Sequence, residues 1–298
     1  MKRRSSLCYL EDIGIKTMNN WSEGIVNIEG MQIHYCRTGG DKPQVVLNHG
    51  ATDDGLCWTR VAKELQADYD LVMVDARGHG LSSSGKGDYL SVSRAEDLSG
   101  LIQTLDLNRP VVGGHSMGAD TSMYLASIYP DQVRGIFMED PPIPIPGEPL
   151  FGGEVGEKYA DPGKMISNIM RIFKILPMFI GKPLARRMMP TSPDDEIIPW
   201  LNSKKRLSGD FLRSLRNASL VHQVEPIDLI QKINIPMLLI IGDRDKGAIV
   251  SKEVAHELAG AGPNLKVVHL AGASHDIRRA KFEGYMQALR EFLVEVYQ

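Results

Sequence analysis

The sequence has few of the features that would place it in a specialised class of protein. Its 298 residues include only three cysteines, Cys8, Cys36 and Cys57, an odd number at unrelated spacings. They predict neither a disulfide framework nor a metal site, and they suit a reducing cytoplasm. No uninterrupted apolar run approaches the ~20 residues that span a bilayer. The basic start "MKRRSSLCYLEDIGIK" is followed by no apolar segment, so no secretory signal is expected.

A large charge of one sign is also missing. The formal net charge is −3, which gives no electrostatic reason to expect nucleic acid or an anionic membrane as a partner. A composition of 43% hydrophobic and 24% charged residues is ordinary for a soluble globular protein. We therefore expect a soluble, cytoplasmic protein that binds a small molecule. The composition leaves the oligomeric state open.

What the first half of the sequence does contain is an alternation of strand-like and helix-like segments. Residues 24–28 and 31–35 predict a hairpin that turns at Glu29-Gly30. The short apolar runs "QVVLNHG", "YDLVMVDARG", "PVVGGHS" and "VRGIFMED" are typical of strands buried on both faces of a parallel sheet. Helical patterns cover about 56–65, 91–105 and 117–129. The alternation predicts a mostly parallel, doubly wound α/β sheet.

The alternation stops at the proline-rich stretch "EDPPIPIPGEP", which cannot continue a helix or a central strand. A mainly helical pattern follows and ends near residue 234. Strand signals then resume in "IPMLLIIGDRD" and "NLKVVHLAGASHD", and a helical pattern over about 277–296 closes the chain. We predict one α/β core formed by residues 1–142 and 235–298, with a helical insertion at 143–234 after the sixth strand.

One serine lies between two glycines at a predicted strand-to-helix junction. The run Gly114-His115-Ser116-Met117-Gly118 fits the G-x-S-x-G pattern of a nucleophile elbow. A serine hydroxyl needs an imidazole to accept its proton and a carboxylate to orient that imidazole. Asp245 follows an apolar strand 129 positions later, and His275 follows the next strand after 30 more. The chain order Ser, Asp, His is that of α/β-hydrolases.

With these motifs and two others, the chain resembles the α/β-hydrolase fold superfamily from about residue 21 to its end. "HGAT" at 49–52 resembles the oxyanion loop of that family, and "DARGHG" at 75–80 resembles the turn after its fourth strand. The resemblance implies the branch with a serine nucleophile and a helical cap over the site. It implies Ser116 as nucleophile, His275 as base and Asp245 as acid, with the backbone amides of Ala51 and Met117 as oxyanion hole. It implies no metal and no organic cofactor.

Some assignments stay open. Asp243 competes with Asp245, although the pattern G-x-x-D from Gly242 favours Asp245. Glu139 is an alternative acid, because some family members carry their catalytic acid after the sixth strand. The remaining histidines of these motifs, His49, His79 and His115, are expected to shape turns or to pack.

The insertion is rich in methionine. Met165 and Met170 are candidates for lining an adaptable apolar pocket, or they pack the core of the insertion itself. Trp58 lines the pocket or anchors its own helix. The predicted function is a serine hydrolase of a small to medium apolar carboxylic ester, thioester or lactone, acting through an acyl-serine. The alternatives are a carbon–carbon bond hydrolase or a cofactor-free perhydrolase with the same triad and, last, a non-catalytic ligand-binding protein.

Overall fold

The computed structural model describes residues 21–298, apart from 85–87, 159–160, 191 and 218–223. An eight-stranded sheet with the order β1-β2-β4-β3-β5-β6-β7-β8 forms its centre. The pairs β1·β2 and β2·β4 are antiparallel and all other pairs are parallel. The strands are β1 Ser22–Ile28, β2 Met31–Arg37, β3 Gln44–Asn48, β4 Asp70–Val74, β5 Val111–His115, β6 Gly135–Glu139, β7 Met237–Ile241 and β8 Leu265–His269. The predicted mostly parallel, doubly wound sheet is confirmed.

Helices cover both faces of this sheet because the central strands bury both of their faces. Val46 of β3 packs in one apolar cluster, whereas its neighbours Val45 and Leu47 pack in another. The first cluster contains residues of α3 (Ser91–Thr104), α4 (Met117–Ile128), α10 (Pro226–Lys232) and α11 (Lys252–Ala261). The second contains residues of η1 (Gly55–Trp58), α2 (Thr59–Leu65), α12 (Ile277–Ala280) and α13 (Phe282–Tyr297).

The predicted hairpin forms between β1 and β2. Its two turn residues, Glu29 and Gly30, have φ angles of 50° and 89°, the left-handed pair that a tight hairpin turn requires. The side chain of Asn27 accepts a hydrogen bond from the amide of Gly30 at 2.9 Å.

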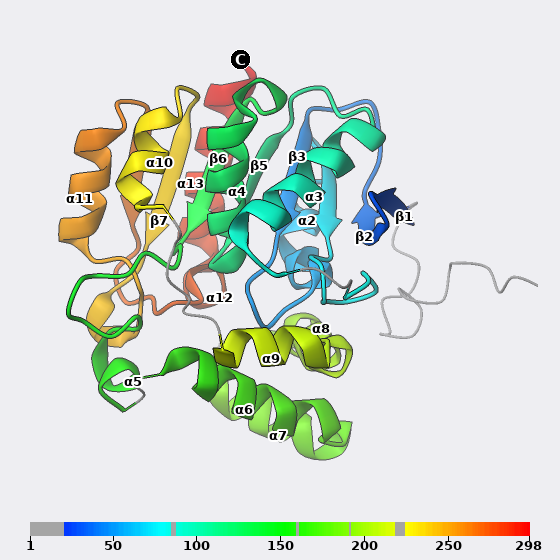
Figure 1. Cartoon of the computed structure of the whole chain (residues 1–298), viewed down its shortest axis with the longest axis vertical. Helices are drawn as coiled ribbons and strands as arrows, with labels where there is room; N and C mark the ends of the chain where they lie inside the picture. Colours follow the sequence, from blue (N-terminus) through cyan, green and yellow to red (C-terminus); the bar gives the residue numbers. More distant parts are fainter. Residues whose placement is uncertain (1–20, 85–87, 159–160, 191, 218–223) are drawn as a thin grey trace, which may run out of the picture.

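Between β6 and β7 the chain forms a series of helices, as the sequence predicts. They are α5 Gly153–Lys158, α6 Pro162–Ile175, α7 Met178–Met188, α8 Asp194–Arg206 and α9 Gly209–Asn217, followed by α10. Helices α6 to α9 lie together below the sheet in Figure 1, and we call them the helical layer. In this layer α8 packs against both α6 and α7, and α9 packs against α6. Helix α10 instead packs against α4 and α11 at the side of the sheet, so the layer ends before residue 226.

Among the described helices, none has the length and apolar character required to cross a membrane.

Candidate active site

Ser116 lies at the turn from β5 into α4 with φ 50° and ψ −116°, a strained conformation for a residue with a side chain. Its amide donates to the carbonyl of Glu139 at 2.9 Å, which fixes the turn beside the end of β6. The flanking glycines are required by space. A Cβ at Gly114 or Gly118 would come within 2.3 or 2.2 Å of the Asn48 carbonyl oxygen. The predicted elbow geometry is therefore present.

A histidine and a carboxylate meet at the same end of the sheet. The His275 Nδ1–H donates to Asp140 Oδ2 at 2.7 Å. Asp140 is fully buried and directly follows the last residue of β6. His275 lies in the loop between β8 and α12. The pairing leaves His275 Nε2 as the nitrogen available to accept a proton.

Backbone donors hold the Asp140 carboxylate in place. The amide of Ile249 donates to Oδ2 at 2.8 Å and the amide of Val250 donates to Oδ1 at 3.0 Å. Asp140 itself has φ 43°, so its backbone leaves the strand direction as the chain turns away from β6. The loop after β7 thus contributes two amides to this carboxylate instead of contributing the carboxylate itself.

This arrangement corrects the predicted acid. Asp245 lies in the short helix η3 (Arg244–Lys246) with its side chain exposed, and His275 Nδ1 bonds Asp140 instead. The other candidate in this loop, Asp243, accepts hydrogen bonds from His269 Nε2 at 2.6 Å and from the amide of Gly272 at 2.7 Å. The sequence argument failed because it placed the acid after β7 by pattern, whereas that loop folds back with its amides toward Asp140.

Glu139, the alternative acid, also has other partners. Its two carboxylate oxygens accept from the amide of Arg278 at 2.8 Å and from the Arg278 guanidinium at 3.0 Å. Glu139 is the last residue of β6 and Asp140 the first residue of the following loop. The expectation of an acid after the sixth strand therefore agrees with the structure, one position later than Glu139.

His115 connects the elbow to the loop that carries His275. Its ring lies 4.5 Å from the His275 ring, centroid to centroid. Its Nε2–H donates to the backbone carbonyl of His275 at 3.0 Å. Burial, followed by the nearby charges of His275 and Arg278, holds the pKa of His115 well below its usual range. His115 is therefore a neutral donor that fixes His275 next to the residue preceding Ser116.

Two opposing influences set the pKa of His275. Burial disfavours the charged imidazolium, while the hydrogen bond to Asp140 and the negative charge of Asp140 favour it. The second influence prevails, and the pKa of His275 is raised above its ordinary value of 6.5. Asp140 thereby makes the imidazole a stronger base and holds one ring tautomer.

The loop after β3 carries the predicted oxyanion donor Ala51, and two buried histidines shape it. His49 Nδ1–H donates to the Gly50 carbonyl at 2.8 Å while its Nε2 accepts from the amide of Ala76 at 3.0 Å. His79 Nε2 lies 3.1 Å from the Ala51 carbonyl. Burial lowers the pKa of His49, and burial with the neighbouring His49 lowers that of His79 to about 3, so both stay neutral. Both act as turn-shaping residues, as the sequence predicts.

The amides of Ala51 and Met117 are the candidate oxyanion donors. Met117 is the first residue of α4, where a helix leaves its amides without an intrahelical acceptor. The positive end of the α4 dipole adds to the attraction for a negative oxygen. The assignment of these two amides as oxyanion donors stays a prediction.

A buried group of charges ties the helical layer to this loop, and the sequence analysis missed it. Lys204 of α8 is fully buried and its Nζ lies 2.8 Å from Asp53 Oδ1. The other oxygen of Asp53 lies 2.8 Å from the Arg279 guanidinium. Burial alone would raise the pKa of Asp53, but Arg279 and Lys204 lower it well below its usual range. Lys204 also donates to the carbonyl of Thr52, next to Ala51. The two aspartates directly after the oxyanion motif, Asp53 and Asp54, were the signal in the sequence that could have predicted this group of charges.

The predicted pocket residues divide between two locations. Trp58 is fully buried in the second core cluster, where the Arg278 guanidinium lies 4.3 Å from the centroid of its ring. Of the two roles predicted for Trp58, its burial therefore favours anchoring η1 and contradicts lining the pocket. Met170 is buried in a third cluster that also contains Met117, whereas Met165 is half-buried. Of these side chains, Met170 therefore belongs to the contact between the helical layer and the elbow.

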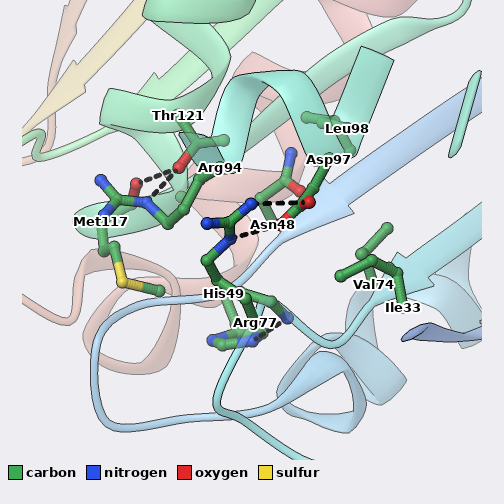
Figure 2. A pocket seen from close by; sticks show the side chains of 12 residues that line it. Ile33, Asn48, His49, Val74, Arg77, Arg94, Asp97, Leu98, Met117 and Thr121 are labelled. Carbon is green, nitrogen blue, oxygen red and sulfur yellow. Dashed lines mark hydrogen bonds and ion pairs between the residues drawn. The ribbon is translucent and has the colours of Figure 1, made fainter. Parts of the chain in front are cut away.

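Figure 2 shows a small cavity behind the elbow, between β3, α3 and α4, lined by both polar and apolar side chains. Arg77 pairs with Asp97 at 2.6 Å, and Arg94 donates to Thr121 Oγ1 at 2.9 Å. The cavity measures about 20 Å³, close to the space that one water molecule needs. It is too small for a substrate, and the ion pair between Arg94 of α3 and Asp120 of α4 at 2.8 Å holds these two helices together.

One group of side chains has donor types that metals use. Ligand atoms of Glu23, His34 and Cys36 lie within 4.8 Å of one another on β1 and β2. Glu23 faces Cys36 directly across the strand pair. Burial, with the charges of Asp75 and Glu23, raises the pKa of the Cys36 thiol well above its usual range. In the protein without a metal this thiol therefore stays protonated, whereas a metal would require the thiolate.

Comparison with known proteins agrees with this geometry. Residues 43–160 match the family model described as alpha/beta hydrolase fold. N-formylmaleamate deformylase from Pseudomonas putida is 26% identical over 280 residues, which cover 91% of this chain and 96% of that protein. 2-(Acetamidomethylene)succinate hydrolase from Mesorhizobium japonicum is 27% identical over 263 residues, covering 86% and 90%. The crystal structure of the N-formylmaleamic acid deformylase from Pseudomonas putida S16 superposes with a TM-score of 0.74 at 22% identity, covering 90% and 100%.

The strand order and the crossover pattern, together with these matches, define an α/β-hydrolase fold. The chain therefore has the α/β-hydrolase fold, and the two curated relatives that cover most of it are named as a deformylase and a hydrolase.

Proposed function

We propose that the chain is a serine hydrolase whose catalytic triad is Ser116, His275 and Asp140. The observation that carries the proposal is the 2.7 Å hydrogen bond between His275 Nδ1 and the buried Asp140 carboxylate, at the strand end beside the Ser116 elbow. A buried carboxylate on one imidazole nitrogen orients the other nitrogen as a general base. Such an arrangement has no evident purpose in a protein that only binds its ligand.

In the proposed reaction His275 Nε2 accepts the Ser116 hydroxyl proton as Ser116 Oγ attacks a substrate carbonyl carbon. The carbonyl oxygen becomes negative in the tetrahedral intermediate, and the amides of Ala51 and Met117 stabilise it. The protonated His275 then donates its proton to the leaving group, which departs and leaves an acyl-serine. A water molecule, activated by the same imidazole, hydrolyses this acyl group and restores the serine.

The proposed substrate class is a small to medium apolar carboxylic ester, thioester or lactone. Support comes from the third apolar cluster, which contains both Met170 of the helical layer and Met117 of the elbow. We propose the helical layer as the cap that selects the acyl group. The names of the two relatives, a deformylase and a hydrolase of an acetamido compound, extend the proposal to N-acyl groups.

The test is a substitution at Ser116 combined with covalent labelling. Ser116→Ala should lower kcat by several orders of magnitude without a change in melting temperature, because the reaction loses its nucleophile. An organophosphonate should add its mass to the peptide that contains Ser116. Ser127→Ala on the same helix is the matched control and should keep full activity.

Two results would contradict the proposal: labelling at a different residue, or an active Ser116→Ala variant. The substrate panel pairs nitrophenyl esters of increasing acyl length with an N-formyl amide and a vinylogous diketone. Turnover of the diketone alone would replace ester hydrolysis with the carbon–carbon alternative while leaving the triad assignment intact.

A further inference from the structure

The outer surface of helices α6 and α7 is unusually apolar for an exposed surface. Six of the large apolar side chains that are exposed in the described part of the chain lie on these two helices. The most exposed are Ile175 at 82% and Phe179 at 78%, on either side of the connection Leu176-Pro177. Soluble proteins seldom gather exposed apolar side chains in this way without a binding function. The six are Ile172, Ile175, Phe179, Ile180, Leu184 and Met188.

These side chains are not needed for the packing of the helical layer. Both helices turn a different face inward, where Phe173 stacks edge-on against Trp200 of α8 at 5.1 Å. A Cβ on the buried Gly181 of α7 would lie 3.2 Å from Leu201 of α8. Figure 1 places α6 and α7 at the end of the molecule furthest from the sheet, with α8 and α9 on their inner side. The apolar side chains of α6 and α7 therefore face outward.

Charge is segregated on the same segment. Residues 162–193 contain six lysines and arginines and no aspartate or glutamate, although the whole chain has a net charge of −3. Lys182 and Arg186 both contact Asp194 at the start of α8. The exposed Arg171 and Arg187 add positive charge beside the apolar side chains. The sequence argument against a membrane partner used the net charge, which averages out this segregation.

We propose that the α6–α7 surface binds the surface of a lipid bilayer that contains anionic lipid. Exposed isoleucine and phenylalanine side chains can enter the interface between headgroups and acyl chains, while surrounding arginines and lysines attract anionic headgroups. A second copy of this chain fits less well, because two such surfaces would bring like charges together. The proposal concerns peripheral binding and is independent of the triad.

The experiment is a flotation assay of the full chain with vesicles of phosphatidylcholine, with and without phosphatidylglycerol. The wild-type chain should float with the vesicles that contain phosphatidylglycerol. Its partition coefficient should be at least tenfold lower for vesicles of phosphatidylcholine alone, and at least tenfold lower in high salt. Replacing both Ile175 and Phe179 by Ser should weaken partitioning by about tenfold or more. Replacing both Arg171 and Arg187 by Ser should have an effect of similar size, confined to low salt. Ile25→Ser, an exposed apolar residue on β1, is the matched control and should bind like the wild type.

Melting temperatures of all variants confirm that the fold is kept, and the charge variant provides a test that does not depend on the apolar substitutions. Equal partitioning of the wild type and both double variants would overturn the proposal. So would an absence of binding to the phosphatidylglycerol vesicles. A wild-type dimer that the Ile175 and Phe179 substitutions convert to a monomer would instead identify a second copy of the chain as the occupant.

Discussion

Asp140 is the residue whose contacts bear most directly on the proposed chemistry. It bonds His275 Nδ1 and two backbone amides, so Asp140→Asn would keep most of the volume but remove the orienting charge. We expect kcat to fall by roughly three to four orders of magnitude, as for the same change in other triads. Asp245→Asn, on an exposed side chain of the neighbouring loop, should stay within about twofold of the wild type. Steady-state kcat for both variants decides the assignment, and the reverse order of effects would return the acid to Asp245.

The raised pKa of His275 leads to a prediction about pH. The imidazole must be neutral to accept a proton, so kcat/KM should fall as the pH decreases through the pKa of His275, above the ordinary 6.5. Asp140 causes the rise, and burial acts in the opposite direction. In Asp140→Asn the residual activity should therefore have its acidic limb at lower pH than in the wild type. A limb that stays in place or moves upward would show that another group controls it.

At the scale of elements, the sequence predicted most of the fold because buried strands leave a simple signal. Continuous apolar runs marked strands such as β5 and β6 to within about two residues, and a proline-rich stretch follows β6 where the series of helices begins. Ser116 and the glycines around it could be predicted because the elbow allows few residue types. Asp140 could not, because the choice between adjacent acids at a strand end depends on where the chain turns.

The contact between α8 and the loop after β3 depends on one buried cation. Lys204→Met would leave Asp53 without one of its partners, and breaking a buried ion pair costs about 3–5 kcal/mol. Because Lys204 also holds the carbonyl of Thr52, beside Ala51, we expect a lower kcat in addition to a lower melting temperature.

The neighbouring Lys205 is exposed, and Lys205→Met is therefore the matched control for both measurements. If Lys204→Met lowered the melting temperature but left kcat and KM unchanged, the ion pair would be purely structural and would not position the oxyanion loop.

At the scale of the whole molecule, contacts between distant parts of the chain could not be predicted from sequence. Asp53, Lys204 and Arg279 lie far apart in sequence, yet they form one buried group of charges. Each looks like an ordinary surface residue in its local pattern. Their proximity depends on how the helical layer and the loops of β3 and β8 are brought to the same end of the sheet.

The apolar contacts divide the molecule into two core clusters that enclose the sheet and a third that belongs mainly to the helical layer. Regions with separate apolar cores open as separate cooperative units in hydrogen exchange. Met170→Ala removes a buried side chain from the third cluster, a change that costs about 2–5 kcal/mol. Amides of α6 to α9 should then exchange at least about thirtyfold faster, while those of β3, β5 and β6 keep their protection.

Met123→Ala on α4 is the matched control, since Met123 is fully buried in the first core cluster, and it should speed exchange in the sheet as well. An equal effect of Met170→Ala on the central strands would mean that the layer and the sheet unfold together. The first turn of α4 is the informative region, because Met117 packs in the third cluster although its helix lies on the core. Faster exchange there in Met170→Ala would show that the helical layer stabilises the proposed oxyanion donor. The proposed role of the layer in substrate selection would then be linked to the geometry at Ser116.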